Sequence, residues 1–222
     1  MKGGMVVYYP YVQQHNRQQS GIMKVTGNGS VSIKPHIVNI QLEVITENDT
    51  LSQAQQENAT IMNQVIQALL QLGINRENIQ TVGYTINPRY DYPDGTQVFR
   101  GYEVNNTINV EITDINQAGN MIDVAVENGV NRVSNIQFTV RNRDMYYQQA
   151  LRAALENAQA KAQTIAESMQ LNLNPVPVKI FEKVSEEPIT YKTFAATEQS
   201  IATPIEPGQI IIEARVEAEF QY

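Results

Sequence analysis

The amino-acid sequence predicts an α+β fold of two strand–helix–strand units, followed by a third long helix and a C-terminal strand. One phrase occurs twice: residues 73–76 read Gly-Ile-Asn-Arg, residues 129–132 read Gly-Val-Asn-Arg, and Asn-Ile-Gln follows both. Each copy comes after an amphipathic stretch and before an alternating one, which is typical of a helix that ends and a strand that begins. An alanine-rich stretch and a cleanly alternating C-terminal stretch complete the pattern.

The first unit begins with alternation from Val38 to Val44, which indicates a half-buried strand. Thr50 with Gln53 predicts a capping box, and Gly73 predicts the left-handed end of the helix. A strand then runs to about residue 88. The turn-rich residues 90–95 predict the tip of a long antiparallel hairpin, which returns over residues 102–112.

The second unit repeats this order. Asp114 with Gln117 predicts a cap, and the helix to Gly129 is about two turns shorter than the first. A third helix is expected over residues 144–169 with an inner stripe of alanines, and a last strand over residues 210–220. We expect the helices to pack on one mixed sheet.

Residues 25–31 predict a hairpin with Asn28-Gly29 as a type I′ turn. Residues 1–20 read as a polar flexible tail or as a segment that adds to a partner's surface. Residues 21–222 form the expected folded domain, made of related units at about 21–97 and 98–222.

Composition narrows the classes of function. The 222 residues carry a net charge of -7, and because an acidic chain repels phosphate backbones we expect no nucleic-acid partner. There is no cysteine, which excludes thiolate catalysis and thiolate metal sites. No apolar run is long enough to cross a bilayer. The N-terminus makes a poor signal peptide, so the sequence predicts a cytoplasmic protein.

No catalytic motif is found, so the chain is predicted to be no enzyme and to need no cofactor or metal. His15 and His36 lack a second ligand at metal spacing. Asp91 and Asp94 fit a turn better than a cation site, and the carboxylates Glu182, Glu186 and Glu187 fit a solvated edge better than an acid–base pair.

Arg76 and Arg132 occupy matching places in the repeated phrase. Two such arginines are the candidates for binding an anion or a partner. The alternative is that both are solvated charges near helix C-termini, where the helix dipole favours them.

Several phrases in order resemble the SIMPL domain family over residues 25–222. They are Val25-Thr26-Gly27-Asn28-Gly29, Asn58, Leu72-Gly73-Ile74, Ile79-Gln80-Thr81, Pro88-Arg89-Tyr90, Gly101-Tyr102, Asn106-Thr107, Phe138-Thr139-Val140, Lys161-Ala162, and Thr203-Pro204-Ile205-Glu206-Pro207-Gly208. The third helix departs from this resemblance, because it ends in Ser168-Met169-Gln170-Leu171 where relatives often have glycine, so we expect its C-terminal cap to differ.

The resemblance implies an α+β fold, self-association, and links to oxidative stress and bacterial envelope assemblies, with no catalytic residues. We therefore expect a non-enzymatic homo-oligomer that acts as a scaffold or a stress-associated interaction module, with a further protein partner. Two alternatives stay open. One is a small-ligand-binding protein or enzyme with a cleft between the units, and the other is an adaptor that binds a peptide or kinase-type partner at a strand edge.

Overall fold

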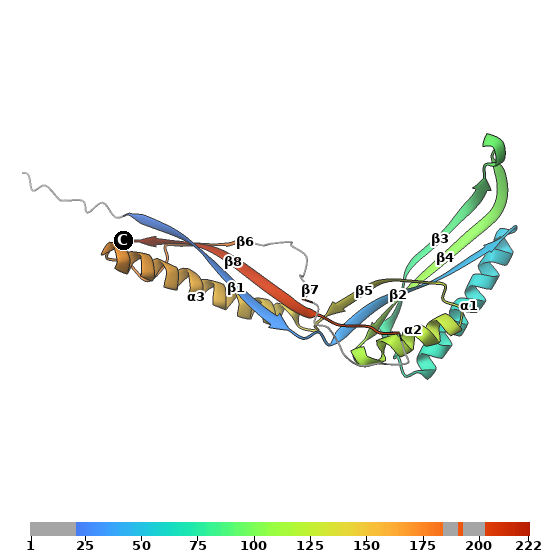
Figure 1. Ribbon diagram of the computed structural model, residues 1–222, viewed down its shortest axis with the longest axis horizontal. Coiled ribbons are helices and arrows are strands. Elements are labelled where there is room, and N and C mark those ends of the chain that lie inside the picture. The colour runs from blue at the N-terminus through green and yellow to red at the C-terminus, as the bar shows by residue number, and fades with distance from the viewer. Residues whose placement is uncertain (1–20, 184–190, 193–202) are drawn as a thin grey trace, which may run out of the picture.

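The protein is elongated and contains two antiparallel sheets, each covered by helices on one face (Figure 1). The computed structural model describes residues 21–183, 191–192 and 203–222. We call β1, α3, β6, β7 and β8 the arm, and β2 to β5 with α1 and α2 the body. The elements are β1 (Ile22–Ile33), β2 (Ile37–Asn48), α1 (Leu51–Gln71), β3 (Ile79–Asp91), β4 (Val98–Ile112), α2 (Ala118–Glu127), β5 (Arg132–Thr139), α3 (Arg143–Met169), β6 (Lys179–Lys183), β7 (Tyr191–Lys192) and β8 (Gln209–Gln221).

The α+β class is confirmed, but the helices do not share one mixed sheet. The arm sheet has the order β1-β8-β6, with β7 also pairing with β8, and the body sheet has the order β3-β4-β2-β5. All described strand pairs are antiparallel. In the body, α1 joins β2 to β3. Because β3 pairs with β4 and does not lie parallel beside β2, the body sheet is antiparallel and not mixed. The predicted unit boundary near residue 97 stays a prediction.

In the arm, α3 makes its closest approach to β1 where glycine meets alanine. A Cβ atom added to Gly27 would lie 2.0 Å from the carbonyl oxygen of Ala154, and one added to Gly29 would lie 2.1 Å from that of Ala150. No side chain fits in that space, so the helix backbone touches the strand. The buried face of α3 is accordingly an alanine stripe: Ala150, Ala154, Ala158, Ala162 and Ala166.

The predicted hairpin at Asn28-Gly29 is wrong, because β1 runs straight through these residues. All twelve residues of β1 pair with β8, from Ile22 opposite Gln221 to Ile33 opposite Ile210. Local turn preference is overridden by this long-range ladder and by the helix above it. The backbone N–H of Asn28 even donates to Asn157 Oδ1 on α3 at 3.1 Å. The glycines serve close packing instead of a turn.

The body packs through large aliphatic side chains instead. One face of β2 and β4 meets α1 and α2 in a core that contains Leu42, Val65, Leu69, Ile108 and Met121, all 1% exposed or less. This matches the alternation predicted for the strand at residues 38–44. On the other face of the same strands most side chains are polar, although Ile45 also lies there, and no helix of the described chain covers this face.

Both body helices end as the repeated phrase predicts. At Gly73 (φ 94°) the N–H of Gly73 bonds Leu70 O and that of Ile74 bonds Leu69 O; at Gly129 (φ 110°) the N–H groups of Gly129 and Val130 bond Val126 O and Ala125 O. This is the Schellman arrangement, which needs a left-handed residue. The arm helix makes the same ending with Gln170 at φ 54°.

The start of α1 differs from the prediction. Thr50 is the N-cap residue, but its side chain makes no capping bond, so the capping box with Gln53 is not formed. The hydroxyl of Thr46 on β2 instead donates to Ala54 O, at 2.8 Å inside the body. At the second helix, Asp114 does accept the N–H of Asn116 and the side-chain amide of Gln117.

A short segment ties the entry of β8 to α2. Both the N–H and the hydroxyl of Thr203 donate to the Asp123 carboxylate. Gly119 on α2 lets this segment approach, since an added Cβ would lie 2.2 Å from Thr203 O. Ile205 packs on the body core. The predicted tail at residues 1–20, which contains His15, lies outside the described residues, and so do Glu186 and Glu187.

Candidate functional site

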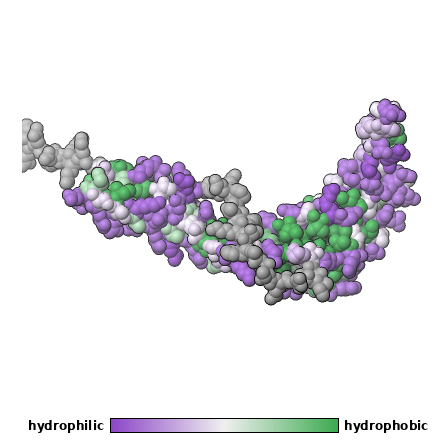
Figure 2. Space-filling view, in the orientation of Figure 1, coloured by the Kyte–Doolittle hydropathy of each residue, from purple (hydrophilic) through white to green (hydrophobic). Residues whose placement is uncertain are grey.

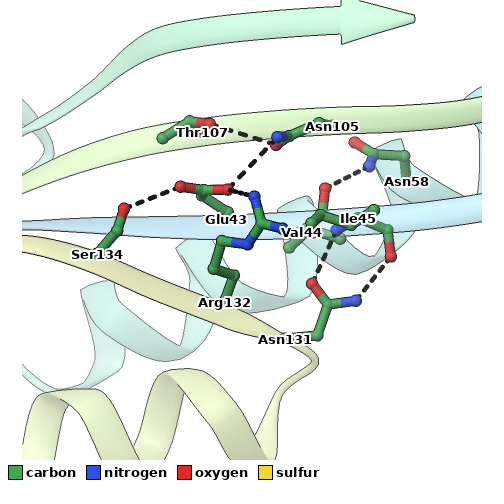
Figure 3. Close-up of polar contacts among 9 residues, drawn as sticks. All are labelled: Glu43, Val44, Ile45, Asn58, Asn105, Thr107, Asn131, Arg132 and Ser134. Carbon is green, nitrogen blue, oxygen red and sulfur yellow. Dashed lines mark hydrogen bonds and ion pairs between the residues drawn. The ribbon is translucent and has the colours of Figure 1, made fainter. Parts of the chain in front are cut away.

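The uncovered face of the body sheet carries a connected polar cluster that is centred on Glu43 (Figure 3). Alternation along β2, β4 and β5 directs the members to this face, opposite the helices. The polar residues of this face include Asn39, Gln41, Glu43, Asn105, Thr107, Asn109, Arg132, Ser134 and Gln137. Asn109 donates to Asn39 Oδ1 at 3.1 Å, which extends the cluster along the sheet.

Glu43 is 8% exposed, and both of its oxygens are engaged. Ser134 Oγ donates to Oε1 at 2.8 Å, while Arg132 Nη1 lies 3.2 Å and Asn105 Nδ2 lies 3.4 Å from Oε2. Thr107 in turn donates to Asn105 Oδ1 at 3.3 Å. Three strands are thus joined through one carboxylate.

The cluster is suited to recognition by hydrogen bonds. Glu43 accepts hydrogen bonds on both oxygens, and none of its bonded partners is a second carboxylate that would make an acid–base pair with it. A buried charge that is paired and hydrogen-bonded fixes the positions of its neighbours. The cluster therefore holds a flat, amide-rich surface in a defined arrangement.

Asn131 also binds β2, as its neighbour Arg132 in the repeated phrase does. Its Oδ1 accepts the N–H of Ile45 at 2.9 Å, and its Nδ2 donates to Ile45 O at 2.7 Å. The amide thus takes the place of a strand partner just where β5 begins. Figure 3 shows Asn131 on the same side of β2 as β5, next to Arg132.

On the helix side, Asn58 of α1 is fully buried and donates to Val44 O at 2.8 Å and to Val104 O at 3.1 Å. Its Oδ1 and the Oδ1 of Asn106 are both buried without a hydrogen-bond partner. Asn106 lies mid-strand, opposite Val44 and Tyr84. Buried amide oxygens without partners are uncommon in folded proteins.

The structure does not bring Arg76 and Arg132 together. Arg76 precedes β3 and Arg132 begins β5, and these strands are opposite edges of the body sheet. Arg76 is exposed and its guanidinium reaches only the nearby Ile79 O, at 3.4 Å. Arg132 pairs with Glu43. Anion or partner binding by either residue stays a prediction.

Other predicted side chains are also placed. His36 Nε2 accepts the N–H of Arg141 at 3.2 Å, which is a structural role. Glu182 is exposed on the edge strand β6, and it accepts a hydrogen bond from the Tyr147 hydroxyl on α3, at 2.5 Å. This bond raises the pKa of the Tyr147 phenol above its usual range. Asp91 forms an ion pair with Arg100 across the hairpin, at 2.7 Å.

One concave surface of the described chain is lined mainly by side-chain amides. A depression of about 510 Å³ lies between α1 and Asn128 and is lined by Thr60, Asn63, Gln64 and Gln67 among others. It holds no titratable side chain. Within residues 21–183, 191–192 and 203–222, no group of three or more His, Asp or Glu side chains is placed to hold a metal ion. No helix of this described part is long and apolar enough to cross a membrane.

Reasoning from the sequence missed Glu43 and Asn131 as organising residues. The signal was present, because Glu43 is the one charged residue in the alternating stretch 38–44, and Asn131 belongs to the repeated phrase. What was missing is the tertiary contact, because residues 43 and 132 meet only when β5 pairs with β2.

Comparison with known proteins gives one family and a few relatives. The SIMPL family, described as a protein of unknown function (DUF541), matches residues 23–220. The 26 kDa periplasmic immunogenic protein of Brucella melitensis is 27% identical over 96% of this chain and 90% of its own length. The uncharacterised protein YggE of Escherichia coli K12 is 28% identical over 73% of this chain and 67% of its own length.

These relatives correct the predicted location. The protein was predicted to be cytoplasmic because its N-terminus makes a poor signal peptide. The Brucella relatives, which align with 96% of the chain, are named periplasmic proteins. The prediction of a cytoplasmic protein is therefore wrong, because a weak N-terminal pattern carried less information than similarity along nearly the whole chain.

Proposed function

Because the chain belongs to the SIMPL family of unknown function (DUF541), we propose that it is a non-catalytic protein that self-assembles and acts as a scaffold or stress-associated interaction module. We place this role in the periplasm, following the names of the Brucella relatives. Cell fractionation that finds the protein with cytoplasmic markers alone would contradict this location.

One observation carries the proposal: each sheet is covered on one face only. The helices lie on the apolar side of both sheets, and the opposite sides of β2, β4, β1 and β8 are uncovered in the described chain. Each sheet also has edge strands, β1 and β6 in the arm and β3 and β5 in the body. Uncovered faces and edges are the surfaces that proteins use to associate.

Some of the charges on these open faces are paired within the chain. Glu43 pairs with Arg132 in the body, and in the arm Lys24 pairs with Glu217 at 2.7 Å and lies 3.8 Å from Glu219. Burying an unpaired charge in an interface costs more free energy than burying a charge that is paired and hydrogen-bonded. The faces therefore favour contacts by hydrogen bonds and packing.

Light scattering of the full chain over a concentration series tests assembly directly. We expect a mass of several chains that falls on dilution. Hydrogen exchange on the concentrated and dilute protein should show added protection in strands, with no change at the outward residues of α1 as the internal control. A single-chain mass at every concentration would contradict the proposal.

The adaptor alternative has one observation in its favour. β3 is a thirteen-residue edge strand that pairs on one side only, with β4. An extended peptide could add to its other side through main-chain hydrogen bonds. A single-chain mass in the scattering experiment would make this the better proposal.

A further inference from the structure

The edge strand β1 lacks the features that protect the edge strands β3, β5 and β6. An open edge presents unpaired N–H and C=O groups on which another chain can pair, and proteins limit this with bulges, prolines, charges or short strands. β3 has a bulge at Val82 and contains Pro88, and β5 has a bulge between Ser134 and Gln137. β6 has only five residues, of which three are charged.

In contrast, β1 is twelve residues long and unbroken. Its register with β8 has no shift from Ile22 to Ile33, it contains no proline, and Lys24 is its one charged residue. A long strand of low charge is a site for edge-to-edge pairing unless something covers it. Any protection of this edge therefore has to come from outside the strand.

The ladder between β1 and β8 identifies which backbone groups lie on the free edge. Just before β1, Gly21 and Tyr222 exchange both of their N–H···O bonds, at 2.9 and 3.0 Å. Such pairs alternate in an antiparallel ladder, so odd-numbered residues of β1 point their N–H and C=O groups to β8, and even-numbered residues point theirs away. The groups on the free edge include those of Lys24, Thr26, Asn28 and Ser30.

Two side chains of α3 occupy the middle of this free edge. Lys161 Nζ donates to Thr26 O at 2.8 Å, and Asn157 Oδ1 accepts the N–H of Asn28 at 3.1 Å. Asn157 and Lys161 are four residues apart, which places both on the same side of the helix. Because a paired strand lies about 4.8 Å from its neighbour, these side chains fill the space that an added strand would need.

The glycines of β1 explain how side chains of the helix reach the strand edge. Gly27 and Gly29 let α3 approach until backbone atoms touch, and Figure 1 shows α3 running along β1. Asn157 has a short side chain, so its bond to the strand depends on this close approach. The surface along α3 is mostly hydrophilic (Figure 2), which suits an edge that faces water. The packing of glycine on alanine therefore also supplies the contacts at the edge.

The strand β2 shows a second case of side-chain bonds to an open stretch of strand. The pairing of β5 with β2 begins at Arg132 opposite Glu43, and β2 continues past this point. There the Asn131 side chain bonds both the N–H and the C=O of Ile45. One amide can do this because it carries a donor and an acceptor. On β1 the donor and the acceptor come from two residues of α3.

We infer that Asn157 and Lys161 close the free edge of β1 to strand addition, so that the arm does not pair edge to edge with the β1 strand of a second copy. Association then has to use one of the other edges or an open sheet face. The closed edge is independent of the proposed self-assembly, because it stays closed whether or not those other surfaces associate.

The double variant Asn157→Ala/Lys161→Ala removes both side chains from the edge. Alanine has the highest helix propensity, so the change does not weaken α3. Two opened β1 strands can pair about a two-fold axis, so light scattering should give at least about twice the wild-type mass at the same concentration. Amide hydrogen exchange, read at single residues, should slow about tenfold at Lys24 and Ser30, whose N–H groups point to the free edge, and stay unchanged at Val25.

Two matched variants separate the edge from the rest of the helix surface. Gln163→Ala/Glu167→Ala removes another pair of α3 side chains four residues apart, which bond each other at 3.0 Å, and it should keep the wild-type mass. Asn157→Asp/Lys161→Arg keeps an acceptor and a donor at the two positions, and it should also keep the wild-type mass.

A second measurement uses dilute protein and does not depend on association. In the single variant Asn157→Ala, exchange of the Asn28 N–H should become about tenfold faster, because its acceptor is lost. Unchanged exchange at Asn28 would overturn the inference, and so would a double variant that keeps the wild-type mass or gains protection only outside β1. A wild-type protein of single-chain mass would contradict the proposed self-assembly and leave the closed edge standing.

Discussion

The arm and the body differ in how their helices pack on the sheet. Both place helices on one face of an antiparallel sheet, but the arm brings backbones into contact through Gly27, Gly29 and alanines, while the body fills the space with large aliphatic side chains. Close approach of a helix to a strand is stabilised by van der Waals contacts between backbone atoms. A wider spacing is filled by large side chains, which bury more apolar area. We therefore expect that adding side-chain atoms between α3 and β1 destabilises the arm. Removing side-chain atoms from the aliphatic core should destabilise the body.

The largest expected effect is an added side chain in the arm. Gly29→Val would place its Cβ against the backbone of Ala150, which cannot move aside, so we expect a loss of more than about 3 kcal/mol or separation of α3. Gly83→Val on β3 is the matched control: its Cβ would meet Thr107 at an ordinary 3.4 Å, and the cost should stay below about 1 kcal/mol. Chemical denaturation measures both. Equal costs would remove the distinction between arm and body.

The next effect is a removed side chain in the body. Leu69→Ala empties part of a fully buried site between α1 and the sheet, and should cost about 2–5 kcal/mol in free energy of unfolding. Ala158→Gly is the corresponding truncation in the arm. It removes one methyl group and some helix propensity, so about 1 kcal/mol is expected. A larger loss for Ala158→Gly than for Leu69→Ala would reverse the comparison.

A smaller effect should separate the two kinds of helix end. Gly73→Ala forces a side chain into φ 94° and should destabilise the body by about 1 kcal/mol. Gln170→Gly relieves the same strain at φ 54° and should stabilise the arm by about 0.5–1 kcal/mol. Thermal melting shows whether each variant is stabilised or destabilised relative to the wild type. A destabilised Gln170→Gly protein would mean that the glutamine side chain, and not the backbone, holds the end of α3.

The smallest expected effect depends on pH and belongs to the arm. The bond to Glu182 raises the pKa of Tyr147, so the folded protein keeps this proton to a higher pH than the unfolded chain does. The stabilisation is complete below the usual tyrosine pKa near 10 and is lost as the pH rises through the raised value. Tyr147→Phe should cost about 0.5 kcal/mol near neutral pH.

Ultraviolet titration of the phenols and denaturation between pH 7 and 11 check this expectation. The matched control is Tyr84→Phe in the body, whose hydroxyl meets only the uncharged amide of Gln55, at 3.4 Å. If Tyr147→Phe and the wild type lose stability in parallel above pH 10, the bond to Glu182 contributes nothing in solution.

Much of the fold could be read from local patterns. The helix predicted between Thr50 and Gly73 is observed over Leu51–Gln71, the alanine-rich helix over Arg143–Met169, and the hairpin tip at Pro93–Gly95. The candidate site could not be read in this way. Glu43, Asn105 and Arg132 are far apart in the chain, and only the order β4-β2-β5 places them together.

The sequence alone determined which segments form the three helices and several of the strands, where both body helices end, and that the chain resembles the SIMPL family. Periodicity and glycine position encode these features, because they depend on neighbours within a few residues. Only the tertiary structure decided that Asn28-Gly29 lies inside a strand and that two sheets form instead of one. It also placed Arg76 and Arg132 at opposite edges. These outcomes depend on contacts between residues far apart in sequence, where pairing and packing outweigh local preference.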